Sequence, residues 1–214
     1  MHIPSIFAED NFDRIIDFIA ANPLATLIAQ TADGIEACHV PLFWYQEDTD
    51  NNYGSLYGHF GRKNPIYNNA LPTTSWLIIF QDSGHYISPN WYPTKAKTHK
   101  EVPTWNYQSV HIQSKIELIE ESNNLKWILE TMTAQQEIIS DNPWSLNDAP
   151  IGYIDAMCRG IIGFKLTIDS IQAQYKLSQN KTAENISGVI SGLEKLDSDH
   201  ATTMAVKVAN HHKP

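Results

Sequence analysis

Five stretches of the chain carry the alternation or the apolar density of β-strands. They are residues 24–45, 53–60, 73–81, 104–120 and 161–178. The first stretch predicts a β-hairpin, because Asp33 and Gly34 separate two apolar runs and both tolerate the positive φ of a tight turn. The last two stretches alternate over many residues and predict long strands. Together the stretches predict an antiparallel barrel or strongly bent sheet of about six strands.

Apolar residues at helical spacing predict helices that cover the ends of this sheet. These helices are expected at residues 9–23, 123–139 and 183–196, with a further short helix beginning near Pro150. Asp10 or Asn11 can cap the first helix, and Pro23 closes it. Strands and helices do not alternate regularly, so a doubly wound parallel sheet is not expected. The predicted class is therefore α+β, mainly β.

The composition excludes several classes of protein. With 214 residues and 42% hydrophobic residues, the chain suits one well-buried core and is not mostly disordered. No apolar run approaches the ~18 residues that cross a bilayer, and we expect no signal peptide at the N-terminus. Cys38 and Cys158 are too few for a disulfide framework or a zinc cluster, so we expect a cytoplasmic protein. A net charge of −9 argues against a dedicated nucleic-acid binder.

The segment that follows the strand at residues 53–60 has the features of an anion site. Asn64 precedes Pro65, and this pair is typical of a helix N-terminus, where free backbone N–H groups can bind a phosphate. Arg62 and Lys63 stand directly before this pair and can reach the same place. The alternative is a capped surface turn with two solvated cations.

Hydrogen-bond donors are concentrated where the last predicted strand ends. They are Lys176, Ser178, Gln179, Asn180 and Lys181. A strand with clean alternation that ends abruptly in donors indicates a ligand at the strand end. The alternative is that Asn180 or Thr182 only caps the following helix.

Residues 86–111 combine prolines with large aromatic side chains, which surface loops seldom contain. The aromatic residues are Trp91, Tyr92, Trp105 and Tyr107. A long connection without regular structure is usually a functional lid or disordered, and this segment is too aromatic for disorder. The segment can form a small core under a loop, or it can stack on a flat ring ligand whose phosphate lies near Arg62.

Four histidines occur in or beside these segments, namely His59, His85, His99 and His111. No two of them have the i, i+4 spacing of a helical metal pair, and no cysteine pair accompanies them. We therefore expect no metal site. A histidine ligand to a haem iron stays open.

Six segments together resemble the PaiB family of FMN-binding proteins, whose members are described as negative transcriptional regulators. They are residues 1–10, 22–42, 53–65, 79–95, 102–120 and 175–193. The most specific motifs are YISPNWYP and VPTWNY, followed by KLSQN. The resemblance implies an antiparallel split β-barrel with flanking helices, related to pyridoxamine-phosphate oxidase-like flavoproteins. It also implies a homodimer with FMN in a groove between the two chains.

The resemblance implies roles for individual residues as well. The FMN phosphate would be bound by His59, Arg62, Lys63 and Asn64. The flavin groove would be lined by Trp91, Thr104, Trp105, Asn106 and Tyr107. The groove would be closed by Lys176, Ser178, Gln179 and Asn180, from the same or the other subunit.

The end of the chain departs from this resemblance. The part after Leu196 matches nothing recognisable in the family, and its pattern is too weak to assign an element. We therefore expect one FMN-binding domain over residues 1–196 and a C-terminal tail over residues 197–214. His211 and His212 are expected to fray in this tail.

Three hypotheses for the function remain open. The first is a flavin-dependent oxidoreductase or redox sensor with an indirect effect on transcription, since no helix-turn-helix with a basic recognition helix is present. The second is a direct DNA-binding repressor that uses the local cluster Lys95, Lys97, His99 and Lys100. The third is a haem-binding or haem-degrading split-barrel protein. No candidate nucleophile stands beside a general base, so no catalytic residue is assigned, and a reduced flavin would carry any chemistry.

Overall fold

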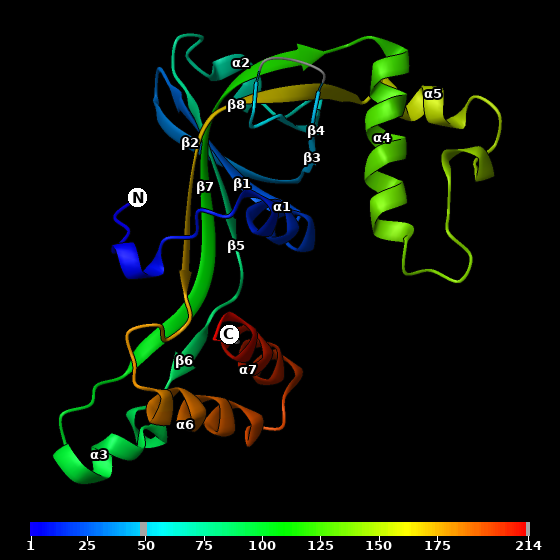
Figure 1. Ribbon diagram of the computed structural model, residues 1–214. Coiled ribbons are helices and arrows are strands. Elements are labelled where there is room, and N and C mark those ends of the chain that lie inside the picture. The colour runs from blue at the N-terminus through cyan, green and yellow to red at the C-terminus, as the bar shows by residue number, and fades with distance from the viewer. Residues whose placement is uncertain (48–50, 213–214) are drawn as a thin grey trace. The chain divides into compact units, whose positions relative to one another are not determined.

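The computed structural model describes residues 1–47 and 51–212 (Figure 1). The strands are β1 (Leu24–Thr31), β2 (Gly34–Pro41), β3 (Phe43–Tyr45), β4 (Ser55–Gly61), β5 (Trp76–Gln81), β6 (His85–Ile87), β7 (Thr104–Ile119) and β8 (Ile161–Lys176). The α-helices are α1 (Phe12–Ala21), α2 (Ile66–Asn69), α3 (Pro93–Thr98), α4 (Ser122–Glu137), α5 (Tyr153–Cys158), α6 (Ala183–Glu194) and α7 (Asp199–His211). Short 3-10 helices lie at Ser5–Phe7, Pro89–Trp91 and Leu146–Asp148.

The strands form one sheet in the order β2-β1-β5-β7-β8-β4-β3, and β6 pairs with β7. The pairs β1–β2, β1–β5, β3–β4, β4–β8 and β6–β7 are antiparallel. This architecture confirms the predicted α+β class with a mainly antiparallel sheet and flanking helices. The sequence pattern does not separately predict β3 and β6, because a strand of three residues shows too little alternation.

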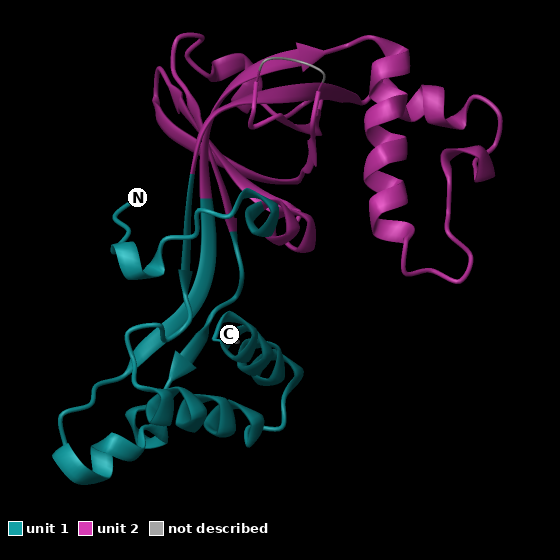
Figure 2. Ribbon diagram, viewed as in Figure 1, with its two compact units in different colours: residues 1–15, 81–110, 172–214 teal, residues 16–80, 111–171 magenta. Residues whose placement is uncertain are grey.

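The chain forms two compact units, each built from several segments (Figure 2). Unit 1 comprises residues 1–15, 81–110 and 172–214, and unit 2 comprises residues 16–80 and 111–171. Strands β5, β7 and β8 contribute residues to both units. The division of the chain at residue 196 into a domain and a tail stays a prediction.

The hairpin and the barrel interior belong to unit 2. Strands β1 and β2 pair from Leu24–Pro41 to Thr31–Gly34, and Gly34 has a φ of 133°, a conformation that favours glycine. Leu27 and Ile78 face each other across β1 and β5 and are fully buried. Such alternating buried residues form the apolar interior that the strand pattern predicts.

Helix α4 packs against the barrel of unit 2 through aromatic rings. The ring of Trp127 lies 5.0 Å from that of Tyr57 and 5.5 Å from that of Phe43, in edge-on geometry. Ile128 of the same helix is fully buried. A Cβ atom at Gly163 of β8 would lie 2.8 Å from Leu125, so the glycine allows the helix to approach the strand closely.

In unit 1, the aromatic segment is more regular than expected. It contains β6, the 3-10 helix at Pro89–Trp91 and α3, so the expectation of a long connection without regular structure is wrong. Trp91 packs against α6 at two glycines. A Cβ atom at Gly188 would lie 2.1 Å from the carbonyl oxygen of Trp91, and one at Gly192 would lie 2.3 Å from its indole ring. The glycines of α6 therefore provide the surface on which this segment rests.

The unassigned C-terminal stretch forms helix α7 in unit 1. The Ser198 hydroxyl caps it by accepting a hydrogen bond of 3.2 Å from Ala201 N, and Val208 is fully buried. Lys207 Nζ lies 2.7 Å from Asp82 Oδ2, which anchors the helix to the segment after β5. The expectation of a frayed end is wrong, because His211 belongs to α7 and His212 Nε2 lies 3.0 Å from Leu177 O.

Candidate functional site

In unit 1, the start of β7 and the end of β8 bring two predicted segments together. Lys176 Nζ donates a hydrogen bond of 2.6 Å to Thr104 Oγ1. Asn106 Nδ2 donates a hydrogen bond of 2.9 Å to Ser178 Oγ, and both of these residues are buried. Because β7 and β8 are neighbours in the sheet, residues far apart in sequence meet here. All four line a pocket of about 180 Å³, which we call the Lys176 pocket.

Of the two lysines that line the Lys176 pocket, only Lys181 is neutralised by a carboxylate within the described residues. Lys181 forms an ion pair of 2.7 Å with Glu101, and its ammonium lies 4.4 Å from the centre of the Tyr92 ring. Hydrogen bonds from Lys181 and then Thr94 hold the pKa of Glu101 below its usual value. Within residues 1–47 and 51–212, no ion pair involves Lys176, and burial lowers the pKa of its ammonium.

The remaining predicted residues after β8 shape the turn. Gln179 Oε1 accepts a hydrogen bond of 2.7 Å from Leu177 N, and Gln179 Nε2 donates to Tyr175 O, so this amide is used internally. Ser178 has a φ of 69°, which is rare for a residue with a side chain. Asn180 is exposed and lines the Lys176 pocket. Thr182, not Asn180, caps α6.

The predicted aromatic residues differ in their surroundings. Trp91 is engaged with α6, which supports the interpretation of a small core at this residue. Trp105 is 54% exposed, and its ring lies 6.2 Å from that of Tyr86 in edge-on geometry. Tyr107 is half-buried. Trp105 is therefore the indole of this segment that offers a free face for stacking.

The predicted phosphate segment lies in unit 2, between β4 and α2. Asn64 Oδ1 accepts a hydrogen bond of 3.1 Å from Ile66 N, but α2 begins at Ile66 and its N-cap is Pro65, whose carbonyl oxygen accepts from Asn69 N at 3.0 Å. The predicted N-cap at Asn64 is therefore wrong by one residue. Arg62 N donates to Gly160 O at 2.8 Å and Asn64 N donates to Gly61 O at 2.8 Å. At the start of α2, Ile66 N donates to Asn64 Oδ1 and Asn68 N donates to Pro65 O at 3.0 Å, so the expectation of free backbone N–H groups is wrong for these two amides. The cationic side chains of Arg62 and Lys63 remain exposed, and Arg62 lies 3.1 Å from Glu120.

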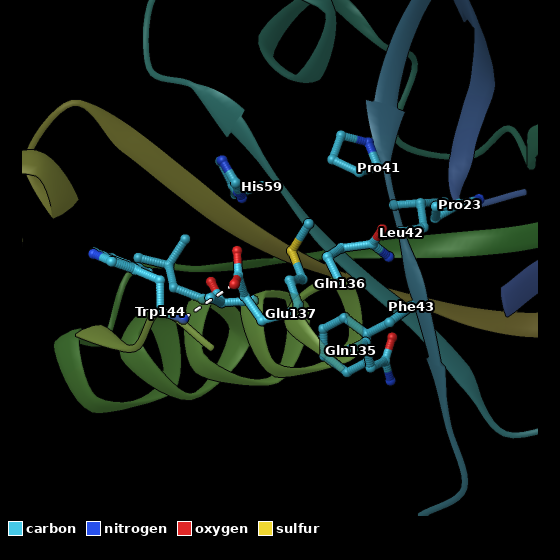
Figure 3. Close-up of a pocket in the computed structure, with 12 residues that line it drawn as sticks. Pro23, Pro41, Leu42, Phe43, His59, Gln135, Gln136, Glu137 and Trp144 are labelled. Atoms are coloured by element: carbon cyan, nitrogen blue, oxygen red, sulfur yellow. Dashed lines mark hydrogen bonds between the residues drawn. The ribbon is translucent and has the colours of Figure 1, made fainter. Parts of the chain in front are cut away.

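His59 of β4 faces an apolar pocket of about 380 Å³ in unit 2 (Figure 3). The wall of this pocket includes Leu42, Phe43, Met132 and Trp144. The Nδ1 atom of His59 is buried and has no hydrogen-bond partner in the described part of the chain, and burial lowers the pKa of the imidazole. Seven of the twelve residues that line this pocket come from α4 and the segment after it, and no local sequence pattern associates these residues with His59.

Two kinds of site are not found in residues 1–47 and 51–212. No group of three or more His, Cys, Asp or Glu side chains is arranged to hold a metal ion. No helix there combines the length and hydropathy needed to cross a membrane.

Comparison with known sequences places the chain in a family. The family described as "Putative FMN-binding domain" matches residues 1–170. The "Protease synthase and sporulation protein PAI 2" of Bacillus subtilis is 33% identical over 205 residues, which cover 96% of this chain and 95% of that protein. Because the match covers 96% of the chain, it includes part of residues 197–214, and the expectation that this stretch has no counterpart is wrong.

Solved structures show the same fold at low sequence identity. The flavocytochrome Anf3 from Azotobacter vinelandii has a TM-score of 0.60 at 13% identity, over 87% of this chain and 78% of that chain. The FAD and heme binding protein from Mycobacterium smegmatis has a TM-score of 0.55 at 12% identity, over 84% of this chain and 78% of that chain. The solved structures show the fold, and the family match over residues 1–170 with the 33% identical relative shows that the chain belongs to the PaiB family of FMN-binding split-barrel proteins.

Proposed function

We propose that this protein binds FMN and acts as a flavin-dependent redox or sensor protein whose effect on transcription is indirect. The observation that carries the proposal is the match of residues 1–170 to an FMN-binding family. The matched range contains β1 to β7, most of β8, and the segments around Arg62 and Trp105. When bound, FMN supplies the electron or hydride chemistry, and the protein contributes position and electrostatic field.

Two sets of side chains in this chain suit parts of FMN. The cations Arg62 and Lys63, with Asn64 and His59 as predicted neighbours, provide charge for a phosphate in unit 2. In unit 1, the exposed indole of Trp105 can stack on a flat ring, with Trp91 and Tyr107 as predicted neighbours. Thr104 and Asn106 would line the flavin groove, and Lys176, Ser178 and Asn180 would close it; these five residues line the Lys176 pocket. We also infer a homodimer, the assembly that the family resemblance implies.

The absorption spectrum of the purified protein and its reconstitution with cofactor test this proposal. We expect a flavin spectrum, or saturable binding of added FMN at one flavin per chain, with weaker binding of riboflavin. Ultrafiltration would show whether the absorbance stays with the protein. A protein that neither carries flavin nor takes up FMN under these conditions would contradict the proposal.

Haem binding is a second candidate, and His59 is the observation that favours it. Its buried Nδ1 has no hydrogen-bond partner in the described part of the chain, and the residue lines a pocket with apolar side chains. A neutral imidazole in an apolar pocket is a suitable axial ligand for haem iron. Titration with haem separates the candidates, because an intense band near the Soret region that is lost in His59→Leu would favour haem over FMN.

A further inference from the structure

The Lys176 pocket contains hydrogen-bond donors for which the described residues provide no acceptor. Tyr92 is only 2% exposed, and its hydroxyl is buried without a hydrogen-bond partner in the described residues. A buried polar group without a partner destabilises the folded state, so it usually marks a water or a ligand. Tyr92 forms part of the wall of this pocket.

Lys176 and Thr104 also have donor hydrogens that are not used within the described residues. The ammonium has three N–H donors, and one of them donates to Thr104 Oγ1 at 2.6 Å. Thr104 Oγ1 is the acceptor in this bond, so its own hydrogen remains free to donate. Lys176 takes part in no ion pair within the described residues, and burial lowers its pKa. A neighbouring anion would stabilise the charged form of this lysine.

Most side-chain acceptors around the pocket are already used; the exposed amide of Asn180, which carries both an acceptor and donors, is the exception. Glu101 accepts from Lys181 at 2.7 Å, from Thr94 at 2.7 Å and from Asn185 at 3.1 Å. Asn106 and Ser178 bond to each other. Apart from Asn180, the free side-chain groups of the pocket are therefore donors. Their net charge is positive because Lys181 is neutralised by Glu101 while Lys176 is not.

We propose that the Lys176 pocket binds a phosphate group through Lys176, Thr104 and Tyr92. A phosphate offers only acceptor oxygens and negative charge, which is the complement of this donor set. The volume of about 180 Å³ suits a group of this size, since pockets for whole drug-sized ligands are about 300–1,000 Å³. The phosphate has two sources, the phosphate of FMN itself or a separate phosphate ester. The first source rests on the proposed flavin binding, and the second does not.

Titration with inorganic phosphate tests the pocket without any flavin. We expect saturable binding by the wild-type protein in calorimetry at constant ionic strength, and roughly ten- to a hundred-fold weaker binding by Lys176→Met, which loses one charge-assisted contact. Lys97→Met is the matched control. It removes the same charge from the same unit, but Lys97 pairs with Glu184 at 3.1 Å and does not line the pocket. Absence of saturable binding, or equal affinities of the two variants, would overturn the proposal.

Tyr92→Phe tests the site with a substitution that is not expected to disturb folding. It removes only the hydroxyl that has no partner, so we expect an unchanged or higher Tm together with roughly five- to ten-fold weaker phosphate binding. A higher Tm with wild-type phosphate affinity would exclude Tyr92 from the site and overturn the proposed donor set.

FMN and riboflavin distinguish the two sources of phosphate. If Lys176→Met weakens FMN and spares riboflavin, the pocket takes the FMN phosphate. If it spares both flavins and weakens inorganic phosphate, the pocket takes a separate phosphate ester. If the wild type binds phosphate but no flavin, the pocket stands and the proposed flavin function fails. An equal loss of both flavins with unchanged phosphate binding would make Lys176 structural.

Discussion

The substitution Arg62→Ala separates a phosphate-binding role of this residue from a structural one. The Arg62 side chain is 41% exposed, and its guanidinium lies 3.1 Å from Glu120, whose side chain is 66% exposed. Exposed ion pairs of this kind contribute about 0–1 kcal/mol to stability. The backbone hydrogen bond from Arg62 N to Gly160 O does not depend on the side chain and remains. We therefore expect the variant to fold, with a free energy of unfolding within about 1 kcal/mol of the wild type.

The expected effect on flavin binding is larger and depends on the phosphate. Once bound FMN excludes water from the contact, loss of one charge-assisted contact costs about 1.5–3 kcal/mol, which corresponds to roughly a ten- to a hundred-fold loss of FMN affinity. Riboflavin lacks the phosphate, so its affinity should not change. The ratio of the two affinities therefore isolates the contribution of Arg62 to the phosphate.

Fluorescence titration of both flavins at constant ionic strength measures this ratio. Glu120→Ala is the matched control, because it removes the carboxylate that competes for the guanidinium. We expect this control to retain or improve FMN affinity. Equal losses for FMN and riboflavin in Arg62→Ala would show that the residue is structural, and unchanged affinities would show that the phosphate binds elsewhere.

Three further outcomes follow from the structure. Gly188→Ala would place a methyl carbon 2.1 Å from the carbonyl oxygen of Trp91, so chemical denaturation should show a free energy of unfolding that is lower by about 1–3 kcal/mol. Gly61→Ala is the control, because its Cβ position is surrounded by open space and no such loss of stability is expected. Trp105→Ala should change the fluorescence of bound flavin, and an unchanged signal with a lower Tm would make this indole structural. With a net charge of −9, the protein should bind its own upstream DNA no tighter than about micromolar at physiological salt; saturable nanomolar binding that survives competitor DNA would refute this.

The sequence predicts most of the fold because each long element carries its own signal. Strand β7 alternates over sixteen residues and α1 has an amphipathic face behind the cap of Asn11. Such local patterns can be recognised in the sequence without knowledge of the tertiary structure. Helix α7 lacks this clarity, since its buried side includes the small residues Ala201 and Ala205. Small side chains contribute little to a hydrophobic pattern, although they allow close packing.

The candidate site is only partly predictable, because its contacts join distant parts of the sequence. The turn at Asn64 involves residues two apart and is visible in the sequence. By contrast, Lys176 and Thr104 are separated by 72 positions, and Lys207 and Asp82 by 125. No local sequence pattern indicates which carboxylate pairs with which cation. The sequence therefore identifies candidate donors but cannot indicate which of them are already used within the chain.

Arg62 and Lys176 appear in the sequence as equivalent anion ligands, but they differ in the structure because only Arg62 has a carboxylate partner within the described residues. At Arg62 a phosphate has to displace the exposed Glu120 and compete with water, where charge pairs are weak. At Lys176 no carboxylate has to be displaced within the described residues, and the lysine is half-buried, where the same charge pair is stronger. Inorganic phosphate can bind at either place independently of flavin. We therefore expect Lys176→Met to weaken its tightest binding, and Arg62→Ala to leave that binding almost unchanged.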